Sequence, residues 1–162
     1  MFVEARLGRM RPIRNSAKAI IIEDGRLLAI KLTDEEGYWY CLPGGGQEPG
    51  EPLEDALRRE CREEISSEIE IDGLRFVRDY IGKNHEFAHK DSDEHNIDLI
   101  FMCRLVEGAQ PQPGSLPDKA QIGIEWLELD RLDSYHLYPL GLRTLIARHE
   151  DPAVPVYLGD MN

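Results

Sequence analysis

Apolar positions in the first quarter of the chain follow the pattern of β-strands. Residues 17–22 and 27–31 are rich in β-forming residues and flank a turn at Asp24-Gly25, which predicts a hairpin. Residues 38–42 form a further short run that ends at Pro43. Beyond it, four more runs predict strands over residues 69–72, 74–81, 97–106 and 122–127.

Two segments have the helical period instead. A helix is expected from Pro52 to about residue 65, because its apolar residues share one stripe at about 100° per residue and proline fits a first turn; the stripe consists of Leu53, Leu57, Cys61 and Ile65. Residues 137–149 repeat this pattern, while residues 33–37, 84–96 and 109–118 are polar or proline-rich and predict loops. Strands mixed with one middle and one late helix indicate an α/β fold, with a mixed sheet covered on both faces.

Length and charge narrow the possible functions. The 162 residues suit a single domain, 1–162, and the net charge of −12 argues against a nucleic acid polymer as partner. No apolar run reaches the length of a membrane span, and charged residues follow the first three residues at once, unlike in a signal peptide. Cys41, Cys61 and Cys103 are an odd number without metal-binding spacing, which favours a reducing compartment, the cytoplasm.

Gly44, Gly45 and Gly46 lie between the strand that ends at Pro43 and the helix over residues 53–65. Because glycines lack side chains, the backbone N–H groups of such a turn can approach an anion such as phosphate. A mobile turn explains three glycines equally well. Their position, just before an acidic helix, is what favours the functional interpretation.

Three glutamates on that helix, Glu60, Glu63 and Glu64, flank its apolar stripe instead of lying opposite to it. Carboxylates at the edge of a core are unfavourable unless they are paired or bound to metal. Because residues three and four apart are neighbours on a helix, all three can converge on one point and bind a hard cation. A surface helix held by Glu–Arg pairs is the alternative, and Glu54 with Arg58 fits it.

Residues 45–67 resemble the Nudix box, G-x5-E-x7-R-E-U-x-E-E-x-G-U, in which U is a bulky apolar residue. Cys61 takes an apolar place, and six fixed positions match: Gly45, Glu51, Arg59, Glu60, Glu63 and Glu64. Ser66 and Ser67 stand where the family has a glycine and an apolar residue. These departures concern the chain after the helix and leave the acidic residues intact. A weaker likeness extends over most of the chain.

The resemblance implies a fold and a chemistry. Nudix proteins are α/β/α sandwiches with a central mixed sheet, and they usually hydrolyse a nucleoside diphosphate linked to another group. The implied function is a hydrolase that depends on Mg²⁺, or on Mn²⁺ in its place. It would cleave the diphosphate linkage of a nucleoside diphosphate derivative or a nucleoside triphosphate through attack of water at phosphorus. Dimers are common in the family, so a homodimer is a further expectation.

The resemblance also assigns roles to matching residues. The implied metal ligands are Glu60, Glu63, Glu64 and the carbonyl of Gly44. Arg59 is expected to orient its neighbours through charge-assisted bonds, and the catalytic set is Glu60, Glu63, Arg59 and Glu51. Substrate binding falls to the glycines and one arginine: Gly44, Gly45, Gly46 and Arg14. The general base is Glu60 or one of three later acids, Glu94, Asp98 and Glu107.

Several other residues have both a functional and a structural interpretation. Arg11, like Arg14, can reach an anionic substrate, and Trp39 and Tyr40 can stack on a base or belong to the core. The polar segment over residues 84–96 is either a mobile lid over the substrate or a solvated loop. Its histidines have no spacing of a defined zinc site; they are His85, His89 and His95.

Two other functions are compatible with the same fold. A non-catalytic nucleotide-binding or sensing module is one, although it has little use for three intact glutamates. A prenyl diphosphate isomerase is the other, and it needs a cysteine and a glutamate at the alkene; Cys41 and Cys103 are the candidates. Signatures that mark particular substrates are missing, since residues 83–85 stand where a proline or tyrosine is sought. The substrate is therefore left open.

Overall fold

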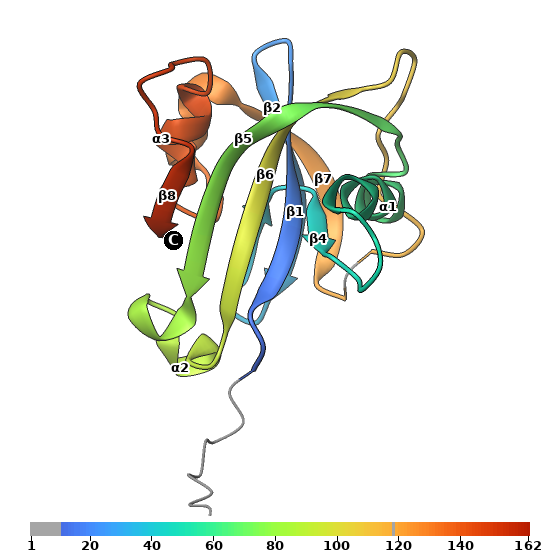
Figure 1. Ribbon diagram of the computed structural model, residues 1–162. Helices are drawn as coiled ribbons and strands as arrows, with labels where there is room; N and C mark the ends of the chain where they lie inside the picture. The colour runs from blue at the N-terminus through green and yellow to red at the C-terminus, as the bar shows by residue number, and fades with distance from the viewer. Residues whose placement is uncertain (1–10, 118) are drawn as a thin grey trace, which may run out of the picture.

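The computed structural model describes residues 11–117 and 119–162 (Figure 1). The strands are β1 (Arg14–Glu23), β2 (Arg26–Asp34), β3 (Gly37–Cys41), β4 (Gly44–Gly46), β5 (Ile69–Ile81), β6 (His95–Leu105), β7 (Gln121–Glu128) and β8 (Tyr157–Asp160). The helices are α1 (Leu53–Ile65), η1 (Gly82–Asn84), α2 (Ala88–Asp91), η2 (Leu129–Ser134) and α3 (Leu142–Ala147).

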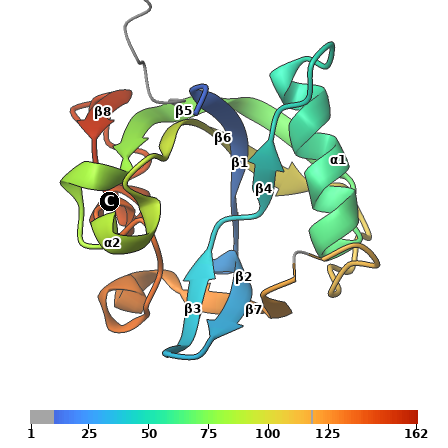
Figure 2. The same ribbon diagram turned by 90° about the horizontal axis from the view of Figure 1, so that it is seen from below.

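The strands form one mixed sheet in the order β3-β2-β1-β6-β5-β8, with β4 paired to β1 and β7 paired to β2. The β1–β6 and β5–β8 pairs are parallel, and the other pairs are antiparallel. The end of β1 pairs with β2 through Ile22 and Glu23, while Arg14–Ile21 pair with β6 and Ser16–Lys18 with β4. β1 therefore joins two parts of the sheet, which curve around a central region (Figure 2).

Helices cover both faces of this sheet, so the predicted α/β/α sandwich is confirmed. Successive residues of β1 point to opposite faces. Ile21 packs with Leu57 and Cys61 of α1 in one core cluster. Ile20 packs with Leu142 and Ile146 in the second cluster, on the other face. Figure 1 shows α1 and α3 at opposite sides of the strands.

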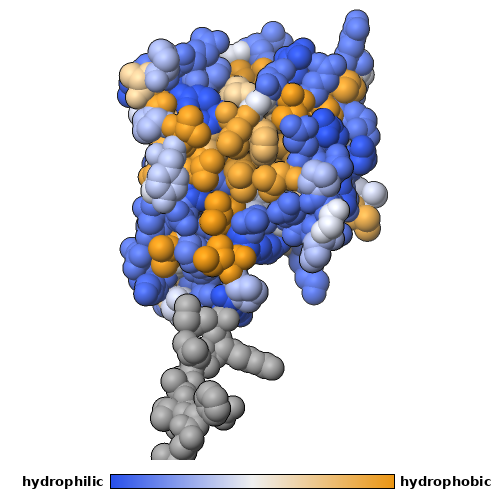
Figure 3. Space-filling view, in the orientation of Figure 1, coloured by the Kyte–Doolittle hydropathy of each residue, from blue (hydrophilic) through white to orange (hydrophobic). Residues whose placement is uncertain are grey.

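The face beside α1 is not fully covered. Ile71, Leu99 and Leu105, on β5 and β6, pack against the α1 cluster but stay partly exposed. Figure 3 shows apolar side chains gathered at the surface over the middle of this face. One helix is narrower than the sheet that it covers, and part of the apolar surface of β5 and β6 therefore reaches solvent.

Two predicted boundaries were wrong. The strands expected over 69–72 and 74–81 are one strand, β5, with register shifts on both sides of Gly73 and Leu74 where it bends past β6. The helix expected over 137–149 begins at Leu142 and ends at Ala147. Its first residues are used elsewhere: the Tyr138 N–H donates to the Tyr40 carbonyl, and Pro139 disfavours a helical conformation at the residue before it.

Five short elements were not predicted, among them η2. The glycines form the strand β4 instead of a free turn, and β8 extends the sheet beyond β5. The segment expected as a loop over 84–96 contains the end of η1, the whole of α2 and the start of β6. In contrast, the hairpin, the helix over 53–65 and the strand over 122–127 are confirmed.

Some expectations fall outside the described residues. The absence of a signal peptide concerns residues 1–10, and the single domain over 1–162 includes these residues and Asp118. Within the two described ranges, no helix combines the length and the apolar character needed to cross a bilayer.

Candidate active site

The glycine strand β4 lies at the edge of a large cavity. Lys18 pairs with Gly44 and Ser16 with Gly46 across the β1–β4 ladder. The cavity has a volume of about 690 Å³ and is lined by all three glycines. This volume falls in the range of small-molecule sites.

Alternate residues of three strands form the floor of this cavity. In register, Ser16 lies beside Asp98, and Asp98 lies beside Arg78. The residues that line the floor point to one face because they are two apart; they are Arg14, Ser16, Lys18, Arg78, Tyr80, Asn96, Asp98 and Ile100. Aromatic residues form much of the wall: Tyr38, Trp39, Phe87 and Tyr138. The site therefore combines cations with apolar rings.

Glu64 reaches the glycine strand from the last turn of α1. Its side chain is 5% exposed, and its Oε2 accepts a hydrogen bond of 3.0 Å from the Gly44 N–H. A buried carboxylate next to the core is thus satisfied, at least in part, by the backbone of β4. The predicted place of Glu64 at the edge of the apolar stripe is confirmed.

The carbonyl groups at the end of α1 are held by residues far along the chain. Gly114 and Gln121 donate to the Glu64 carbonyl at 2.9 Å each, and Gln112 donates to the Ile65 carbonyl at 3.0 Å. The last carbonyls of a helix have no partner within the helix. The segment that precedes β7 therefore fixes the turn of α1 that carries Glu63 and Glu64.

Arg59 links the acidic residues of the helix to the chain before it. It donates to Glu51 at 2.7 Å, to Glu60 at 3.0 Å and to the Gly46 carbonyl at 3.0 Å. The hydrogen bond from Arg59 holds the pKa of Glu51 below its ordinary value, and the Glu48 N–H adds to this effect. The orienting contact expected for Arg59 is present.

Glu60 lies against Gly45 in a partly buried position. A Cβ atom on Gly45 would stand 2.6 Å from the Glu60 carboxyl carbon, so this approach requires glycine. Burial raises the pKa of Glu60 above its ordinary value, and the charge of Glu63 adds to the rise; Arg59 and Lys18 offset part of it.

The expected convergence of the three glutamates is not what the structure contains. Within residues 11–117 and 119–162, no three acidic, histidine or cysteine side chains are gathered as a metal-binding group. Glu60 and Glu63 both face Arg59, at 3.0 Å and 3.5 Å, while Glu64 turns to Gly44. Like charges repel, and each carboxylate here contacts an N–H group of the protein instead. The candidate metal ligands are nonetheless carboxylate oxygens, which suit Mg²⁺.

Lys18 was missed in the sequence and belongs to this region. Its Nζ donates to the Gly44 carbonyl at 2.8 Å. Burial lowers the pKa of Lys18, but the electrostatic effect of its neighbours outweighs it and holds the pKa above its ordinary value; the neighbours are Cys41, Asp98, Glu64 and Glu60. The side chain is therefore an ammonium. The sequence feature that could have indicated this role is a lysine within an otherwise apolar strand.

The alternative general bases have different surroundings. Asp98 lies in the cavity floor with 7% exposure, and Arg78 donates to its Oδ2 at 2.8 Å through both Nε and Nη2. Glu94 is paired with Arg11, which also lies 3.0 Å from Asp93. Arg11 is thus engaged by acids and does not line the cavity, whereas Arg14 does. Glu107 is exposed, beyond the far end of β6.

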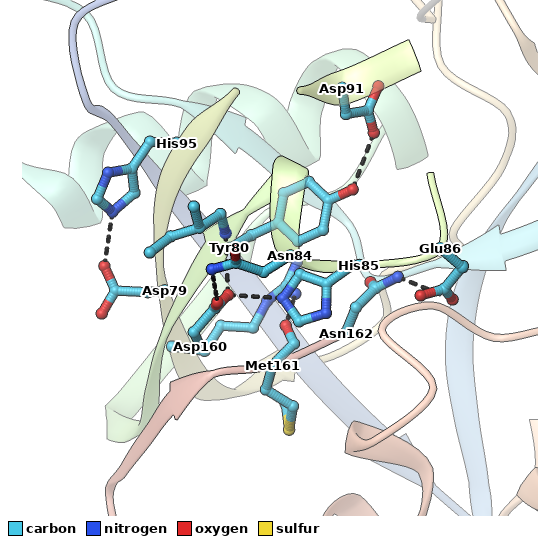
Figure 4. Close-up of polar contacts among 12 residues, drawn as sticks. Asp79, Tyr80, Asn84, His85, Glu86, Asp91, His95, Asp160, Met161 and Asn162 are labelled. Carbon is cyan, nitrogen blue, oxygen red and sulfur yellow. Dashed lines mark hydrogen bonds and ion pairs between the residues drawn. The ribbon is translucent and has the colours of Figure 1, made fainter. Parts of the chain in front are cut away.

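Residues 82–94 are tied to the end of the described chain, as Figure 4 shows. Asp160 accepts hydrogen bonds from Asn84 at 2.8 Å and from the Ile81 N–H at 3.0 Å, and it lies 2.6 Å from His85. Burial raises the pKa of Asp160, but these hydrogen bonds outweigh it and lower the pKa to about 2. The segment expected as a lid or solvated loop is therefore folded and anchored.

The histidines of this segment do not share a partner. His85 lies beside Asp160, and His95 lies 2.9 Å from Asp79. Tyr40 belongs to the core and donates to Glu125 at 2.7 Å, whereas Trp39 lines the cavity. Of the two cysteines considered for isomerase chemistry, Cys41 lines the cavity and Cys103 is buried.

Comparison with known proteins decides the family. A family model described as the NUDIX domain matches residues 12–148. The chain belongs to the Nudix family. Nucleoside triphosphatase NudI of Escherichia coli O1:K1 is 39% identical over 90 residues, which are 52% of this chain and 63% of that protein. The chain thus spans less than two thirds of the curated relatives that it matches.

Solved structures of Nudix proteins share the fold. An ADP-ribose pyrophosphatase from Streptococcus suis 89-1591 has a TM-score of 0.65 at 20% identity, over 92% of this chain and 100% of its own. A MutT NUDIX hydrolase from Burkholderia pseudomallei has a TM-score of 0.63 at 25% identity, over 86% and 98%. The overlap extends well beyond the Nudix box, as the weaker sequence likeness suggested.

The structure explains both departures from the Nudix box. Ser66 has φ 52° and ψ 34°, the left-handed conformation in which the family has its glycine. Ser67 is buried, but its hydroxyl donates to the Ile65 carbonyl at 3.2 Å, so a polar side chain fits the apolar place. The chain after α1 thus adopts at Ser66 a conformation that favours glycine, although serine stands there.

Replacing Ser66 with glycine should stabilise the protein. A left-handed conformation costs an ordinary residue about 1–2 kcal/mol, which glycine avoids. Glycine also gives the unfolded chain more conformational freedom, which lowers stability by about 0.4–1 kcal/mol. On balance we expect the free energy of unfolding to rise by roughly 0.5–1 kcal/mol. Urea unfolding measures it. Ser67→Gly, which removes a buried hydrogen bond, should lose stability in the same assay. A less stable Ser66→Gly protein would contradict the strain at this position.

Proposed function

We propose that this protein is a Mg²⁺-dependent hydrolase of a nucleoside triphosphate or a nucleoside diphosphate derivative. The observation that carries the proposal is the position of Glu60 and Glu64, which contact the Gly44–Gly46 strand at the edge of the cavity. Membership of the Nudix family and the activity stated for NudI, a nucleoside triphosphatase, support the same reaction class.

The cavity lining contains four acidic residues, Asp34, Glu36, Asp91 and Asp98, beside four basic ones, so it is the cations of its floor, and not its net charge, that can hold an anionic substrate. The whole chain carries a net charge of −12, yet Arg14, Lys18 and Arg78 lie in the cavity floor and Lys90 lies among its lining residues. Cations gathered in a cleft of an acidic protein attract phosphate groups. The aromatic wall, which includes Trp39, offers surfaces on which a nucleobase stacks.

The acidic residues fit a divalent metal by the chemistry of their oxygen donors. Glu60, Glu63, Glu64 and the Gly44 carbonyl are the proposed ligands, with Mg²⁺ preferred and Mn²⁺ as a substitute. When bound, the metal would neutralise phosphate charge and make water a better nucleophile. Arg59 and Glu51 would hold these ligands in place through the contacts described above.

We assign the general base to Glu60. It would take a proton from the attacking water, while the bond between phosphorus and the bridging oxygen breaks. Asp98 is engaged by Arg78 and Glu94 by Arg11, and Glu107 lies beyond the far end of β6. Glu60 is paired as well, with Arg59 at 3.0 Å, but it differs from the other three in lying against Gly45 of the glycine strand at the edge of the cavity, and we prefer it for that position. Arg14 and the glycine strand would then hold the phosphate groups of the substrate.

A substrate panel tests this proposal. The purified chain is incubated with Mg²⁺ or Mn²⁺ and nucleoside triphosphates, ADP-ribose, nucleotide sugars or dinucleoside polyphosphates. We expect metal-dependent cleavage of at least one class, with one ¹⁸O from labelled water in a phosphate product. Nucleotide binding without any cleavage would instead support the sensing module.

The remaining expectations concern assembly and location. We propose a cytoplasmic protein, which the reduced cysteines Cys41, Cys61 and Cys103 support. Its partner is a small nucleotide rather than a nucleic acid polymer or a membrane. A homodimer is compatible with the partly exposed apolar face beside α1. Light scattering of the purified chain tests the dimer, and cell fractionation tests the location.

A further inference from the structure

Lys18 brings a positive charge to the centre of the acidic region. Its Nζ donates to the Gly44 carbonyl at 2.8 Å, and the N–H of Gly44 donates to Glu64 at 3.0 Å. The Glu60 carboxylate lies against the next residue, Gly45. One ammonium and two carboxylates therefore meet around two consecutive glycines of β4.

The charges around these glycines are unequal. Arg59 faces three carboxylates, Glu51, Glu60 and Glu63, at 2.7, 3.0 and 3.5 Å. With Glu64 there are four carboxylates, against the three cations Arg59, Lys18 and Arg14, whose guanidinium lies against Gly46. The region therefore keeps a net negative charge, and without Lys18 that charge would be larger.

We propose that Lys18 is a resident cation that weakens binding of the divalent metal: it occupies the Gly44 carbonyl and balances Glu60 and Glu64, so an incoming ion must compete with it. This inference rests on the proposed function, because it concerns the same ligands. Lys18 is in this sense a positioning residue, and it sets how much free metal the site requires.

The sign of the effect separates this role from a structural one. A lysine that merely supports β4 would, when removed, loosen the Gly44 carbonyl and weaken metal binding. A competing ammonium would, when removed, leave its carboxylates with a larger negative charge and strengthen metal binding. Opposite charges in a partly buried region interact more strongly than in water, so the change is large enough to measure.

Binding of Mn²⁺ to the full chain, followed by electron paramagnetic resonance of the free ion, provides the test. Lys18→Gln removes the charge and keeps a polar side chain that can donate a hydrogen bond. We expect its dissociation constant for Mn²⁺ to fall by about tenfold or more. An unchanged or larger dissociation constant would overturn the proposal.

Two further variants serve as controls. Lys90→Gln removes a lysine that also lines the cavity but pairs with Glu36 at 3.3 Å, and its Mn²⁺ affinity should equal that of the wild type. Lys18→Arg keeps the charge and should stay within about threefold of the wild type. If Lys18→Gln does not fold, the arginine variant decides: affinity raised tenfold despite the retained charge would contradict the competition.

Hydrolysis measured on the same preparations distinguishes the two proposals. Tighter Mn²⁺ binding by Lys18→Gln, with no nucleotide cleaved by the wild type, would leave this inference intact and remove the proposed function. Active wild type with no change in Mn²⁺ affinity in Lys18→Gln would remove this inference alone. A wild-type chain that binds no Mn²⁺ would overturn both.

Discussion

Replacing Glu64 with Gln should lower kcat/KM by at least about a hundredfold while the fold survives, since loss of a group that only supports a metal ligand already costs about 10–100-fold. Glu64 is 5% exposed and accepts a hydrogen bond from the Gly44 N–H at 3.0 Å. The amide oxygen of glutamine can accept the same bond at nearly the same volume. What disappears is the negative charge, which a Mg²⁺ ligand supplies.

Steady-state kinetics at saturating Mg²⁺ and urea unfolding measure the two sides of this prediction. Glu54→Gln is the matched control, because Glu54 lies on the same helix but pairs with Arg58 at the surface. Its activity should stay near that of the wild type. An active Glu64→Gln protein would remove Glu64 from the proposed ligands. An unfolded one would show that the carboxylate is needed for folding.

The helix of the Nudix box was predictable because its information is local. The spacing of Leu57, Cys61 and Ile65 places the buried stripe, and it also places Glu64 at the edge of the core. The contact between Arg59 and Glu51 was expected from the family resemblance and is present. Residues within one helix and the turn before it meet wherever the rest of the chain goes.

The surroundings of that helix depend on distant residues. Lys18 donates a hydrogen bond to the carbonyl of Gly44, 26 residues later in the chain. Gly114 donates one to the carbonyl of Glu64, 50 residues earlier. Such contacts follow from sheet order and loop path, which periodicity does not specify. For the same reason Asp98 and Arg78 were not expected as a pair.

The errors in secondary structure have a similar origin. The stripe of Leu142, Leu145 and Ile146 is real, but it belongs to a shorter helix because Tyr138 bonds to Tyr40 on β3. The β4 strand was read as a turn because glycine has a low strand propensity. Pairing with β1 and the close approach of Glu60 override that propensity.

Gly44→Ala should mainly lose stability and Gly45→Ala should mainly lose activity, although the two residues are neighbours in β4. Gly44 has φ +126°, and its Cβ would collide with the Ala17 carbonyl oxygen and lie 2.9 Å from the Lys18 Cα. Neither backbone atom can move without disrupting the β1–β4 pair. We expect Gly44→Ala to lose more than about 3 kcal/mol of unfolding free energy, as strained backbone and overpacking add.

At Gly45 the added Cβ meets the end of a side chain instead of backbone. It would lie 2.6 Å from the Glu60 carboxyl carbon, and rotation of Glu60 relieves the clash at the expense of its 3.0 Å contact with Arg59. We expect a stability change of under about 1.5 kcal/mol and a loss of about tenfold or more in kcat/KM, because displaced catalytic groups are costly.

Urea unfolding and steady-state kinetics of both variants, beside Gly123→Ala, test this pair. Gly123 is a matched control on β7, since no atom lies within 4 Å of its Cβ position. Gly44→Ala should be the least stable of the three, and Gly45→Ala should be stable but catalytically impaired.

A fully active Gly45→Ala protein would mean that catalysis tolerates displacement of Glu60, and the general base would then have to be sought elsewhere, first at Asp98. A stable Gly44→Ala protein would mean that β4 is not held against β1 as closely as the register requires, and the position of the Gly44 carbonyl between Lys18 and the glutamates would lose its support.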